Sequence, residues 1–559
     1  MPPDTNPFDV RAAVQELSAA AWPERKKRMH PIHRRFIQSA RRHPFRTAMA
    51  DAQTDALPFH RALAAAIFIG RRLKPIWADD RHVGILLPPS VPGASVNFAA
   101  LLAGKIPVNL NYTLSPDGLA SCIRQTGLRR VITSQAFLDR LNLGLQCDKV
   151  EISEVVNAPR LTEKLAAALA AWFLPARLVE RSLGAARPSR MDDDATVIFS
   201  SGSTGDPKGV PLTHYNIGSN IEQLAQMFAL DGDARFLGVL PFFHSFGFTG
   251  TMCLPAALGF GVAFHANPLE ARVIGDLVQR FNVTFILATP TFIQIYTRGC
   301  AQEQFGGVNT VLVGAEKLPD RIADAFEKKF GLRPMEAYGC TECSPAVSVN
   351  TLDFRAAGFR QVGGKRGSIG HPLPGMSARI IDPDSGTPLP PNEPGLLLLK
   401  GPNVMNGYLG LPDKTAEVLK DGWYVTGDIA RVDEDGFIVI TDRLSRFSKI
   451  GGEMVPHIKV EDLLHEFIES HEQSFAVTGV PDEKKGERLV VLHTLEDADI
   501  EPCLEKLASA EIPNLWKPRA DDFIKVDSLP YLGTGKLNLA EIRAIAGRGK
   551  SERRDEVKE

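Results

Sequence analysis

The residues from Val197 to Val210, VIFSSGSTGDPKGV, have the types and spacing needed to hold a polyphosphate. The apolar run Thr196 to Phe199 predicts a short buried strand that ends in small and hydroxylated residues. Small residues let the backbone approach phosphate closely, and glycine lets successive N–H groups point into one concavity. We expect phosphate contacts from Ser200, Ser201, Gly202, Ser203, Thr204, Gly205 and the positively charged Lys208.

Two other interpretations of this stretch fit less well. Pro207 stands where the P-loop pattern has its second glycine, so the stretch is not a P-loop. A flexible Ser/Gly linker is the other alternative, but linkers are seldom preceded by a strand or followed by Lys-Gly-Val.

Further motifs follow this stretch in a fixed order. They are Val313 to Leu318 (VGAEKL), Tyr338 to Glu342 (YGCTE), Tyr424 to Asp428 (YVTGD), Asp442-Arg443 leading into Lys449 to Gly452 (KIGG), and Gly533 to Lys536 (GTGK). Together they resemble the acyl-adenylate-forming superfamily of acyl-CoA synthetases, firefly luciferase and nonribosomal-peptide adenylation domains. The resemblance extends from about residue 30 to about residue 545.

The resemblance implies ATP and Mg²⁺ as cofactors and assigns a role to each motif. Tyr338, followed by Gly339, matches the aromatic residue that stacks on adenine, and Asp428 and Arg443 match the ribose contacts. The backbone edge beside the base corresponds to Gly314, Ala315 and Glu316. Taken singly, each of these residues is also common in ordinary turns and on protein surfaces.

The same resemblance places the catalytic residues. Thr341 and Glu342 match the positions that contact the α-phosphate and hold Mg²⁺, a hard cation suited to carboxylate oxygen. Lys536 matches the lysine that bridges the substrate carboxylate and the α-phosphate, although an exposed lysine is the ordinary alternative. Lys449 matches a lysine presented during the second half-reaction.

The substrate site is predicted at Pro241 to Phe248, PFFHSFGF, where His244 lies among four phenylalanines. With Gly247, Gly259 and Gly261 nearby, these residues could line an apolar channel with His244 at its mouth, and a packed aromatic core is the alternative favoured by composition. This segment and Gly401 to Tyr408, GPNVMNGY, resemble the acyl-acyl-carrier-protein synthetase part of bacterial 2-acylglycerophosphoethanolamine acyltransferase, as does Arg446 to Val455.

That closer resemblance implies activation of a long-chain fatty acid and transfer to the phosphopantetheine thiol of acyl carrier protein. A fatty acyl-CoA synthetase is the alternative, and a non-catalytic adenylate or fatty-acid sensor is a remote one. The adenylation domain is expected to start near residue 30 and the single H-x-x-x-x-D spacing, His457 to Asp462, is interpreted as accidental, so lysophospholipid acylation is not expected within these residues. Ser445 also departs from the Asp or Lys that is usual at the superfamily's hinge.

Composition limits the class of protein. A net charge of −2 gives no basic footprint for nucleic acid, and 44% hydrophobic with 23% charged residues is typical of a globular protein. Seven cysteines without a secretory signal indicate free thiols in a reducing, cytoplasmic compartment. Cys340 and Cys343 form a C-x-x-C, but no second pair follows, so a metal or redox role is disfavoured.

Membrane contact is considered for one segment. The run Leu165 to Ala176 leads into Arg177, Arg181, Arg187 and Arg190, and it could lie peripherally on the inner face of a membrane. A helix packed on the first domain is the preferred alternative, because Pro175 breaks the run and alanine supplies little apolar area. The basic segment Arg25 to Arg28 is interpreted as a solvated charge run.

The alternation of apolar strands with helical patterns predicts an α/β fold with largely parallel sheets. We expect an N-terminal extension (1–29), a large adenylation domain of layered α/β subdomains with a β-rich subdomain from Ile369 to Ile440 (30–442), and a hinge (443–446). A small mobile α+β C-terminal domain (447–545) and a charged tail (546–559), expected to be disordered from Arg548 to Glu559, complete the prediction.

Overall fold

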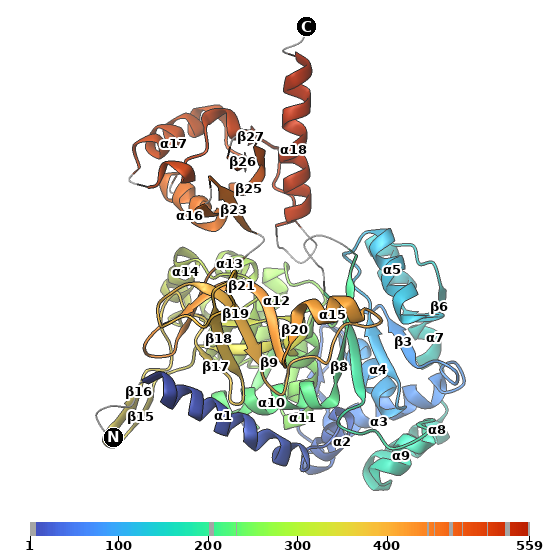
Figure 1. Cartoon of the computed structure of the whole chain (residues 1–559). Helices are drawn as coiled ribbons and strands as arrows, with labels where there is room; N and C mark the ends of the chain where they lie inside the picture. Colours follow the sequence, from blue (N-terminus) through green and yellow to red (C-terminus); the bar gives the residue numbers. More distant parts are fainter. Residues whose placement is uncertain are drawn as a thin grey trace.

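A computed structural model of the chain describes residues 7–200, 206–230, 232–443, 446–451, 453–468, 473–482, 485–510, 512–531 and 537–556 (Figure 1). Several predicted residues therefore lie outside the described part of the chain: Ser201, Gly202, Ser203, Thr204, Gly205, Ser445 and Lys536. The backbones of Arg443 and Lys449 are described, but their side chains are not.

The largest element is a nine-stranded sheet in the order β17-β14-β13-β12-β11-β9-β10-β1-β2. Its six central strands, from β13 to β1, are parallel to one another. This confirms the predicted parallel α/β architecture, because the apolar runs near Phe236, Val262, Phe285 and Thr310 all form strands of this sheet. The strands are β1 (Thr47–Ala50), β2 (Leu57–Pro58), β9 (Arg235–Gly238), β10 (Gly261–Phe264), β11 (Phe285–Ala288), β12 (Thr310–Val313), β13 (Met335–Gly339), β14 (Ala346–Val349) and β17 (His371–Pro372).

A second, four-stranded parallel sheet has the order β4-β3-β5-β6 and contains the predicted strands at Val83 and Val131. It consists of β3 (His82–Ile85), β4 (Ile106–Asn109), β5 (Arg130–Thr133) and β6 (Asp148–Glu151). Beside it lies the antiparallel hairpin of β7 (Asp194–Ser200) and β8 (Lys208–Thr213), and Thr196 Oγ1 donates to the Pro107 carbonyl at 2.8 Å. The strand predicted at Thr196 to Phe199 is thus confirmed.

Helices cover these sheets, and their ends follow familiar capping rules. Ser90, Ser115 and Thr213 each accept a backbone N–H in the first turn of the helix that follows, which satisfies a donor that the helix itself leaves open. The helices are α1 (Pro7–Lys26), α2 (Ile32–Arg42), α3 (Phe59–Leu73), α4 (Val91–Leu102), α5 (Pro116–Thr126), α6 (Gln135–Leu141), α7 (Ile152–Val156), α8 (Leu161–Phe173), α9 (Ala176–Ser182), α10 (His214–Phe228), α11 (Leu254–Leu258), α12 (Ala271–Arg280), α13 (Pro290–Gly299) and α14 (Asp320–Phe330), with a π-helix η1 (Phe246–Cys253) and 3₁₀ turns η2 (Gln302–Phe305) and η3 (Thr341–Cys343).

The β-rich subdomain is present as predicted. A five-stranded antiparallel sheet combines β18 (Ser377–Ile381), β19 (Gly395–Lys400), β20 (Leu419–Lys420), β21 (Trp423–Val432) and β22 (Ile438–Arg443), with α15 (Pro412–Val418) inserted before β20. A separate hairpin of β15 (Phe354–Ala356) and β16 (Phe359–Gln361) projects from the nine-stranded sheet (Figure 1).

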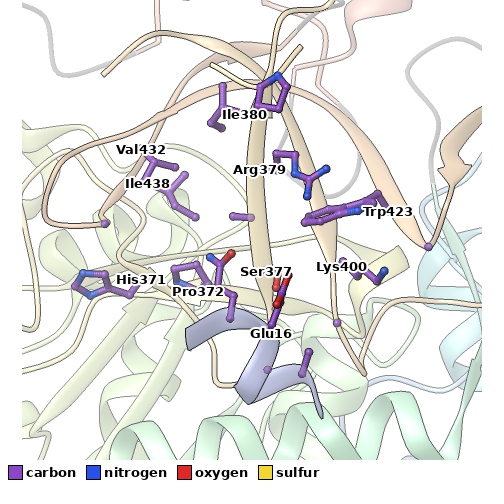
Figure 2. A pocket seen from close by; sticks show the side chains of 18 of the residues that line it. Glu16, His371, Pro372, Ser377, Arg379, Ile380, Lys400, Trp423, Val432 and Ile438 are labelled. Carbon is purple, nitrogen blue, oxygen red and sulfur yellow. The ribbon is translucent and has the colours of Figure 1, made fainter. Parts of the chain in front are cut away.

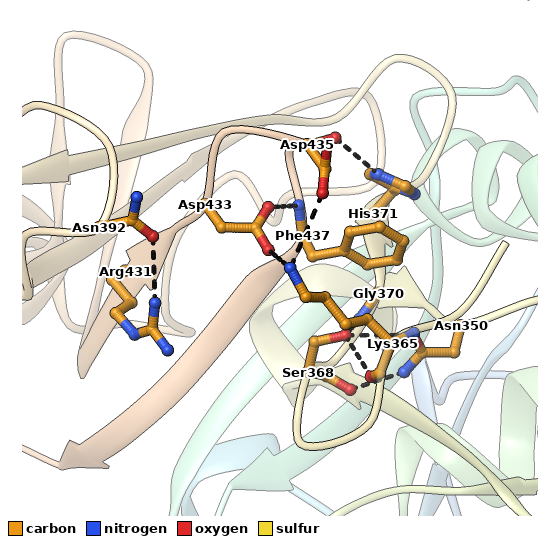
Figure 3. Close-up of polar contacts among 10 residues, drawn as sticks. All are labelled: Asn350, Lys365, Ser368, Gly370, His371, Asn392, Arg431, Asp433, Asp435 and Phe437. Carbon is orange, nitrogen blue, oxygen red and sulfur yellow. Dashed lines mark hydrogen bonds and ion pairs between the residues drawn. The ribbon is translucent and has the colours of Figure 1, made fainter. Parts of the chain in front are cut away.

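A polar network ties this subdomain to the nine-stranded sheet (Figure 3). Lys365 Nζ lies 2.5 Å from Asp433, whose other oxygen accepts the Phe437 N–H at 2.9 Å at the turn between β21 and β22. Asn350, directly after β14, donates to the carbonyls of Ser368 at 2.6 Å and Glu336 at 3.1 Å. The network therefore fixes the position of β21 relative to β13.

The chain beyond β22 forms its own layered unit, with a hydrophobic core that includes Val460, Phe475 and Val491. It contains β23 (Phe447–Ile450), β24 (Glu453–Pro456), α16 (His457–Ile468), β25 (Phe475–Asp482), β26 (Gly486–His493), α17 (Asp497–Ser509), η5 (Asn514–Trp516), η6 (Ala520–Asp522), β27 (Phe523–Lys525) and α18 (Leu539–Glu556). The expectation of a disordered tail from Arg548 is wrong in one respect, because helix α18 continues through this charged segment to Glu556.

The N-terminal helix α1 packs on the β-rich subdomain. Trp22 is buried against Gly375, and Arg25 and Lys26 form ion pairs with Glu222 and Asp192. The segment Arg25 to Arg28 is solvent-exposed, as predicted, apart from Lys26, which is partly buried. A cavity of about 970 Å³ lies between α1 and the sheet, lined by Glu16, His371, Ser377, Arg379, Lys400 and Trp423 among others (Figure 2), and none of the predicted site residues lines it.

Helices α8 and α9 pack on the N-terminal helices, as the preferred sequence interpretation expects. Ala167, Ala170 and Ala171 are the buried residues of α8. Among the described residues, no helix has the length and apolar character required to cross a bilayer.

A buried ionic cluster anchors α9 to α2. Glu180 is 1% exposed and accepts from Arg34 Nη2 at 2.8 Å and from His33 Nε2 at 3.0 Å. Burial acts to raise the pKa of Glu180, but the hydrogen bonds from Arg34 and His33 outweigh it and hold this pKa at about 2. The segment leading from α9 into the β7–β8 hairpin is thereby held in place.

Replacing Glu180 by alanine is expected to lower the free energy of unfolding by about 3–5 kcal/mol, because Arg34 would keep a partly buried charge without its partner. Urea unfolding measures the change. Asp55→Ala is the matched control, since Asp55 is exposed in its pair with Arg280, and we expect it to cost less than about 1 kcal/mol. Equal costs for the two variants would contradict this account of the cluster.

Candidate active site

The predicted nucleotide motifs meet at the carboxyl ends of the parallel strands β12 and β13, where ligands of open α/β sheets bind. Gly314, Ala315 and Glu316 follow β12 directly, and Tyr338 and Gly339 are the last residues of β13. Parallel neighbours end at the same edge of a sheet, so these two motifs, more than twenty residues apart in sequence, lie side by side.

Backbone geometry explains the residue types at this edge. Ala315 has a φ of +76°, a left-handed conformation that is uncommon for a residue with a side chain and often found at functional sites. At Gly339 a Cβ atom would lie 2.3 Å from the Pro345 carbonyl oxygen, so only glycine fits.

Tyr338 and Asp428 are brought together from different sheets. The Tyr338 hydroxyl donates to Asp428 Oδ2, and Asp428 is 3% exposed on β21. Arg443 stands directly opposite Asp428 in the antiparallel pairing of β21 and β22. The predicted adenine and ribose residues therefore share one location.

Tyr408 connects the β7–β8 hairpin, which we call the phosphate hairpin, to the predicted metal ligand Glu342. The Lys208 ammonium lies 3.5 Å from the Tyr408 hydroxyl and 4.6 Å from the centre of its ring. That hydroxyl donates to Glu342 Oε1 at 2.9 Å, and Glu342 is buried. Burial, together with the nearby Glu342 carboxylate, raises the pKa of Tyr408, so the phenol remains a donor.

These residues fit ATP and Mg²⁺. Ser200 Oγ, at the end of β7, is buried and has no hydrogen-bond partner among the described residues, as expected of a donor aimed at a phosphate. Mg²⁺ is usually held by one or two carboxylates together with substrate phosphates, and Glu342 can supply the carboxylate. Within the described ranges, no group of three or more His, Cys, Asp or Glu residues could hold a metal alone.

Hydrogen bonds from Asn403 stabilise the turn that carries Thr341 and Glu342. This buried amide donates to the carbonyls of Cys343 at 2.7 Å and Ala346 at 2.9 Å. The seven cysteines are free thiols, and a hydrogen bond to Cys343, together with burial, raises the pKa of Cys340. Thr341 itself is partly exposed at the start of η3.

Sequence reasoning assigned no role to Tyr408 or Asn403. Both belong to the segment Gly401 to Tyr408, which was used only as a point of resemblance. Its composition gives a usable signal, because an asparagine and a tyrosine in a Gly/Pro-rich loop are unusual core residues unless their polar atoms are paired.

Glu336 is a further titratable group that the sequence did not single out. It lies two residues before Tyr338 on β13, hence on the same face of the strand, and accepts the Leu318 N–H at 3.4 Å. Burial raises the pKa of Glu336 to about 7. Carboxyl groups with raised pKa values are characteristic of functional sites.

The predicted substrate segment is mainly a packed core. Phe242, Phe243 and Phe248 are buried, whereas Phe246 is partly exposed and lies near Gly314. His244, next to the π-helix η1, contacts the Phe243 ring at 5.4 Å between centroids. Single π-helical segments are frequent at functional sites, so His244 and Phe246 remain candidates for contact with the acid.

The three glycines predicted beside the channel do not have the expected role, since a Cβ on Gly247 would already lie 2.1 Å from the Pro241 carbonyl oxygen. A Cβ on Gly259 would lie 2.9 Å from His43, and one on Gly261 would lie 3.0 Å from the Thr47 carbonyl. Their missing side chains make room for protein atoms, and the prediction that they keep a channel open is wrong.

The C-terminal unit contacts the segment that follows β12 through helix α16. Lys317, next to Glu316, forms an ion pair with Asp462 at 2.8 Å. The described residues that flank the Lys536 segment, Tyr531 and Leu537, form an antiparallel bridge, and the Glu316 charge is one cause of the raised pKa of Tyr531, after burial. Lys449 pairs with Met454 in the β23–β24 hairpin.

The H-x-x-x-x-D spacing has no catalytic geometry. His457 is buried and bonded to Ser448 Oγ at 2.8 Å, and burial lowers its pKa to about 3. Asp462 instead pairs with Lys317.

A comparison with protein families assigns this site. A model of AMP-binding enzymes matches residues 36–409, which include the phosphate hairpin, the Gly314 edge and the Glu342 turn. The chain belongs to the AMP-binding enzyme family. It is therefore an ATP-dependent ligase that forms an acyl-adenylate and releases AMP, and enzymes of this family use ATP with Mg²⁺.

Relatives match over most of the chain. Feruloyl-CoA synthase from an Amycolatopsis species is 31% identical over 545 residues, 96% of this chain and 100% of that protein. The long-chain-fatty-acid–CoA ligase of Bacillus subtilis is 35% identical over 356 residues, 62% of this chain and 60% of that protein. The enzyme of the same name from Escherichia coli O6:H1 is 28% identical over 524 residues, 88% and 89% of the two chains.

Solved structures share the fold. ATP-bound MatB from Rhodopseudomonas palustris has a TM-score of 0.76 at 23% identity, covering 92% of this chain and 98% of its own. The o-succinylbenzoate CoA synthetase from Bacillus subtilis with ATP and magnesium has a TM-score of 0.75 at 22% identity, covering 92% and 99%. The two-part α/β architecture is confirmed by these likenesses.

We expect Tyr408→Phe to lower the rate of adenylate formation by about 10- to 100-fold and to raise the Mg²⁺ concentration that half-saturates the enzyme, because Glu342 loses the donor that orients it. Pyrophosphate exchange at varied Mg²⁺ measures both quantities. Tyr296→Phe is the control, since the buried Tyr296 hydroxyl has no partner among the described residues. An unchanged Mg²⁺ requirement in Tyr408→Phe would remove Tyr408 from the metal site.

Proposed function

We propose that this ligase activates a long-chain fatty acid and transfers the acyl group to a phosphopantetheine thiol. The observation that carries the adenylation step is the connected arrangement Lys208–Tyr408–Glu342 beside the Tyr338–Asp428 pair. The similarity to long-chain-fatty-acid–CoA ligases over 88% of the chain supports the fatty acid and the thiol.

In the first half-reaction, a carboxylate oxygen of the acid attacks the α-phosphorus of ATP, and the bond to pyrophosphate breaks. Negative charge develops on the departing pyrophosphate and around the α-phosphate. We expect Lys208 and the hydroxyl of Ser200 to stabilise the leaving group, and Glu342 to hold the Mg²⁺ that neutralises phosphate charge. Lys536 would bridge the carboxylate and the α-phosphate, in line with the superfamily resemblance.

In the second half-reaction, the thiol sulfur attacks the acyl carbonyl carbon, and AMP leaves as the acyl–phosphate bond breaks. We propose that residues 443–446 act as a hinge, so that the C-terminal unit presents Lys536 in the first step and Lys449 in the second. One rigid placement cannot easily bring both lysines to the same adenylate.

Coenzyme A is the acceptor that the relatives favour, because the relatives described above are CoA ligases and a CoA synthase. Acyl carrier protein is the second candidate, and the resemblance of Pro241 to Gly247 and Gly401 to Tyr408 to acyl-acyl-carrier-protein synthetases supports it. Both acceptors end in the same pantetheine arm, so the thiol chemistry is shared.

A side-by-side assay identifies the acid and the acceptor. Palmitate, octanoate and ferulate are each supplied with ATP and Mg²⁺, and either CoA or phosphopantetheinylated acyl carrier protein is added. We expect thioester formation with palmitate to exceed that with ferulate by at least about tenfold, since a pocket that accepts a long chain gains transfer energy from each methylene. Preference for ferulate would contradict the fatty-acid proposal. Absence of pyrophosphate release with all three acids would show that the enzyme adenylates neither fatty acids nor ferulate.

Lys536→Ala is expected to reduce adenylate formation by about 10²–10³-fold while leaving thioester formation from supplied acyl-adenylate nearly unchanged, because it removes a charge needed only in the first step. Lys517→Ala, in the same C-terminal unit, is the control, since its exposed ammonium contacts the Ala508 carbonyl. Normal adenylate formation by Lys536→Ala would show that another group bridges the carboxylate and the α-phosphate.

A further inference from the structure

Helix α8 exposes its bulky apolar side chains, and its buried residues are the alanines Ala167, Ala170 and Ala171. Leu161, Leu165, Leu169 and Phe173 follow one another at spacings of four residues and lie on one side of the helix. Their exposed fractions are 71%, 54%, 59% and 75%. A surface helix ordinarily turns its larger apolar residues toward the core, so this arrangement needs a reason other than folding.

The apolar surface continues beyond α8. Trp172 is 38% exposed, and its ring lies 6.2 Å from that of Phe45, which is 78% exposed after the end of α2. Leu178 on α9 is also exposed. We refer to this surface as the α8 face; its members are Phe45, Leu161, Leu165, Leu169, Trp172, Phe173 and Leu178.

The α8 face is held firmly by polar contacts behind it. Arg41 donates to the carbonyls of Ala171 and Leu174 at the end of α8, and Arg72 binds Glu163 at 2.7 Å near its start. Because both ends of the helix are fixed, the face is presented as one preformed surface.

The exposed charges on α8 and α9 themselves are positive. On α8 and α9 the exposed charged side chains are Lys164, Arg177 and Arg181. The two glutamates of these helices are engaged elsewhere, Glu163 with Arg72 and Glu180 in the buried cluster with Arg34. A rim of this sign complements an anionic surface.

We propose that the α8 face docks on the surface of a bilayer containing anionic lipids, with its leucines and aromatic rings in the acyl boundary and Lys164, Arg177 and Arg181 at the headgroups. Amphipathic helices with aromatic and leucine side chains and basic flanks lie in this way in the interface plane. Trp172 suits the boundary because its ring is apolar and its N–H can reach polar groups. At 13 residues, α8 is about 20 Å long and too short to span the hydrocarbon core.

A second copy of the chain is a poorer occupant of this face. In a two-fold dimer the same patch meets itself, so the basic rims of both copies would be brought together without acidic partners. Anionic lipid supplies the opposite charge directly.

The proposal is tested by sedimentation of the full chain with vesicles of phosphatidylcholine alone or with phosphatidylglycerol. We expect binding to the anionic vesicles, a loss of at least about tenfold in partition coefficient for Leu165→Ser/Phe173→Ser, and a selective loss of the anionic preference for Arg177→Glu/Arg181→Glu. The control is Phe354→Ser/Phe359→Ser, which alters two phenylalanines that are 58% and 56% exposed on the β15–β16 hairpin. This hairpin lies far from α8, on the opposite side of the molecule in Figure 1.

Three results of the vesicle experiment would overturn the proposal. The first is absence of vesicle binding by the unaltered chain, and the second is equal binding by Leu165→Ser/Phe173→Ser. The third is an equal loss in the hairpin control, which would place the contact elsewhere. Sedimentation velocity without lipid is the complementary measurement, because a dimer that Leu165→Ser/Phe173→Ser dissociates would assign the α8 face to a second copy. Thermal unfolding and adenylation of a short acid verify that the variants remain folded, since none of the altered residues contacts the active site.

Discussion

The active site depends on a short chain of contacts that joins three separate segments, from Lys208 through the Tyr408 hydroxyl to Glu342. Lys208 stands on the phosphate hairpin, Tyr408 on the loop after β19, and Glu342 on the turn after β13. Buried polar groups must be paired, and here each group has its partner on another segment. The energetic requirement to satisfy these groups therefore also fixes the distance between a phosphate-binding cation and a metal-binding carboxylate.

The rest of the fold can be understood as support for this arrangement. Parallel strands bring the Gly314 edge and Tyr338 to one end of the nine-stranded sheet, whereas Asp428 belongs to a different, antiparallel sheet. The network around Lys365, Asp433 and Asn350 holds these two sheets in register, so that Tyr338 can bond Asp428. The ion pair of Glu180 with Arg34 fixes α9, and with it the start of the segment that leads into the phosphate hairpin.

Much of this could be predicted from the sequence, because strands rich in apolar residues and ordered motifs are local signals. The β7 strand, the central parallel strands, the β-rich subdomain and the C-terminal unit were all expected, and the structure contains them. The pairing of Tyr338 with Asp428 and the position of Tyr408 could not be predicted, since they depend on how two sheets pack. Gly247, Gly259 and Gly261 were misassigned because sequence alone does not show which atoms fill the space beside a glycine. Membrane contact of the α8 segment was considered but not preferred, because an apolar helix is normally expected to pack with its larger residues inward and sequence alone does not show that its leucines face outward. The assignments of the phosphate-loop residues 201–205, Lys449 and Lys536 remain predictions.

A double-mutant cycle of Tyr408→Phe and Glu342→Gln tests the central claim most directly, with the Mg²⁺-dependent rate of pyrophosphate exchange as the readout. If the Tyr408 hydroxyl acts by orienting Glu342, its removal should matter much less once the carboxylate is gone, giving a coupling energy of about 0.5–3 kcal/mol. Strictly additive effects, with a coupling energy indistinguishable from zero, would show that the two residues act independently and would contradict the account.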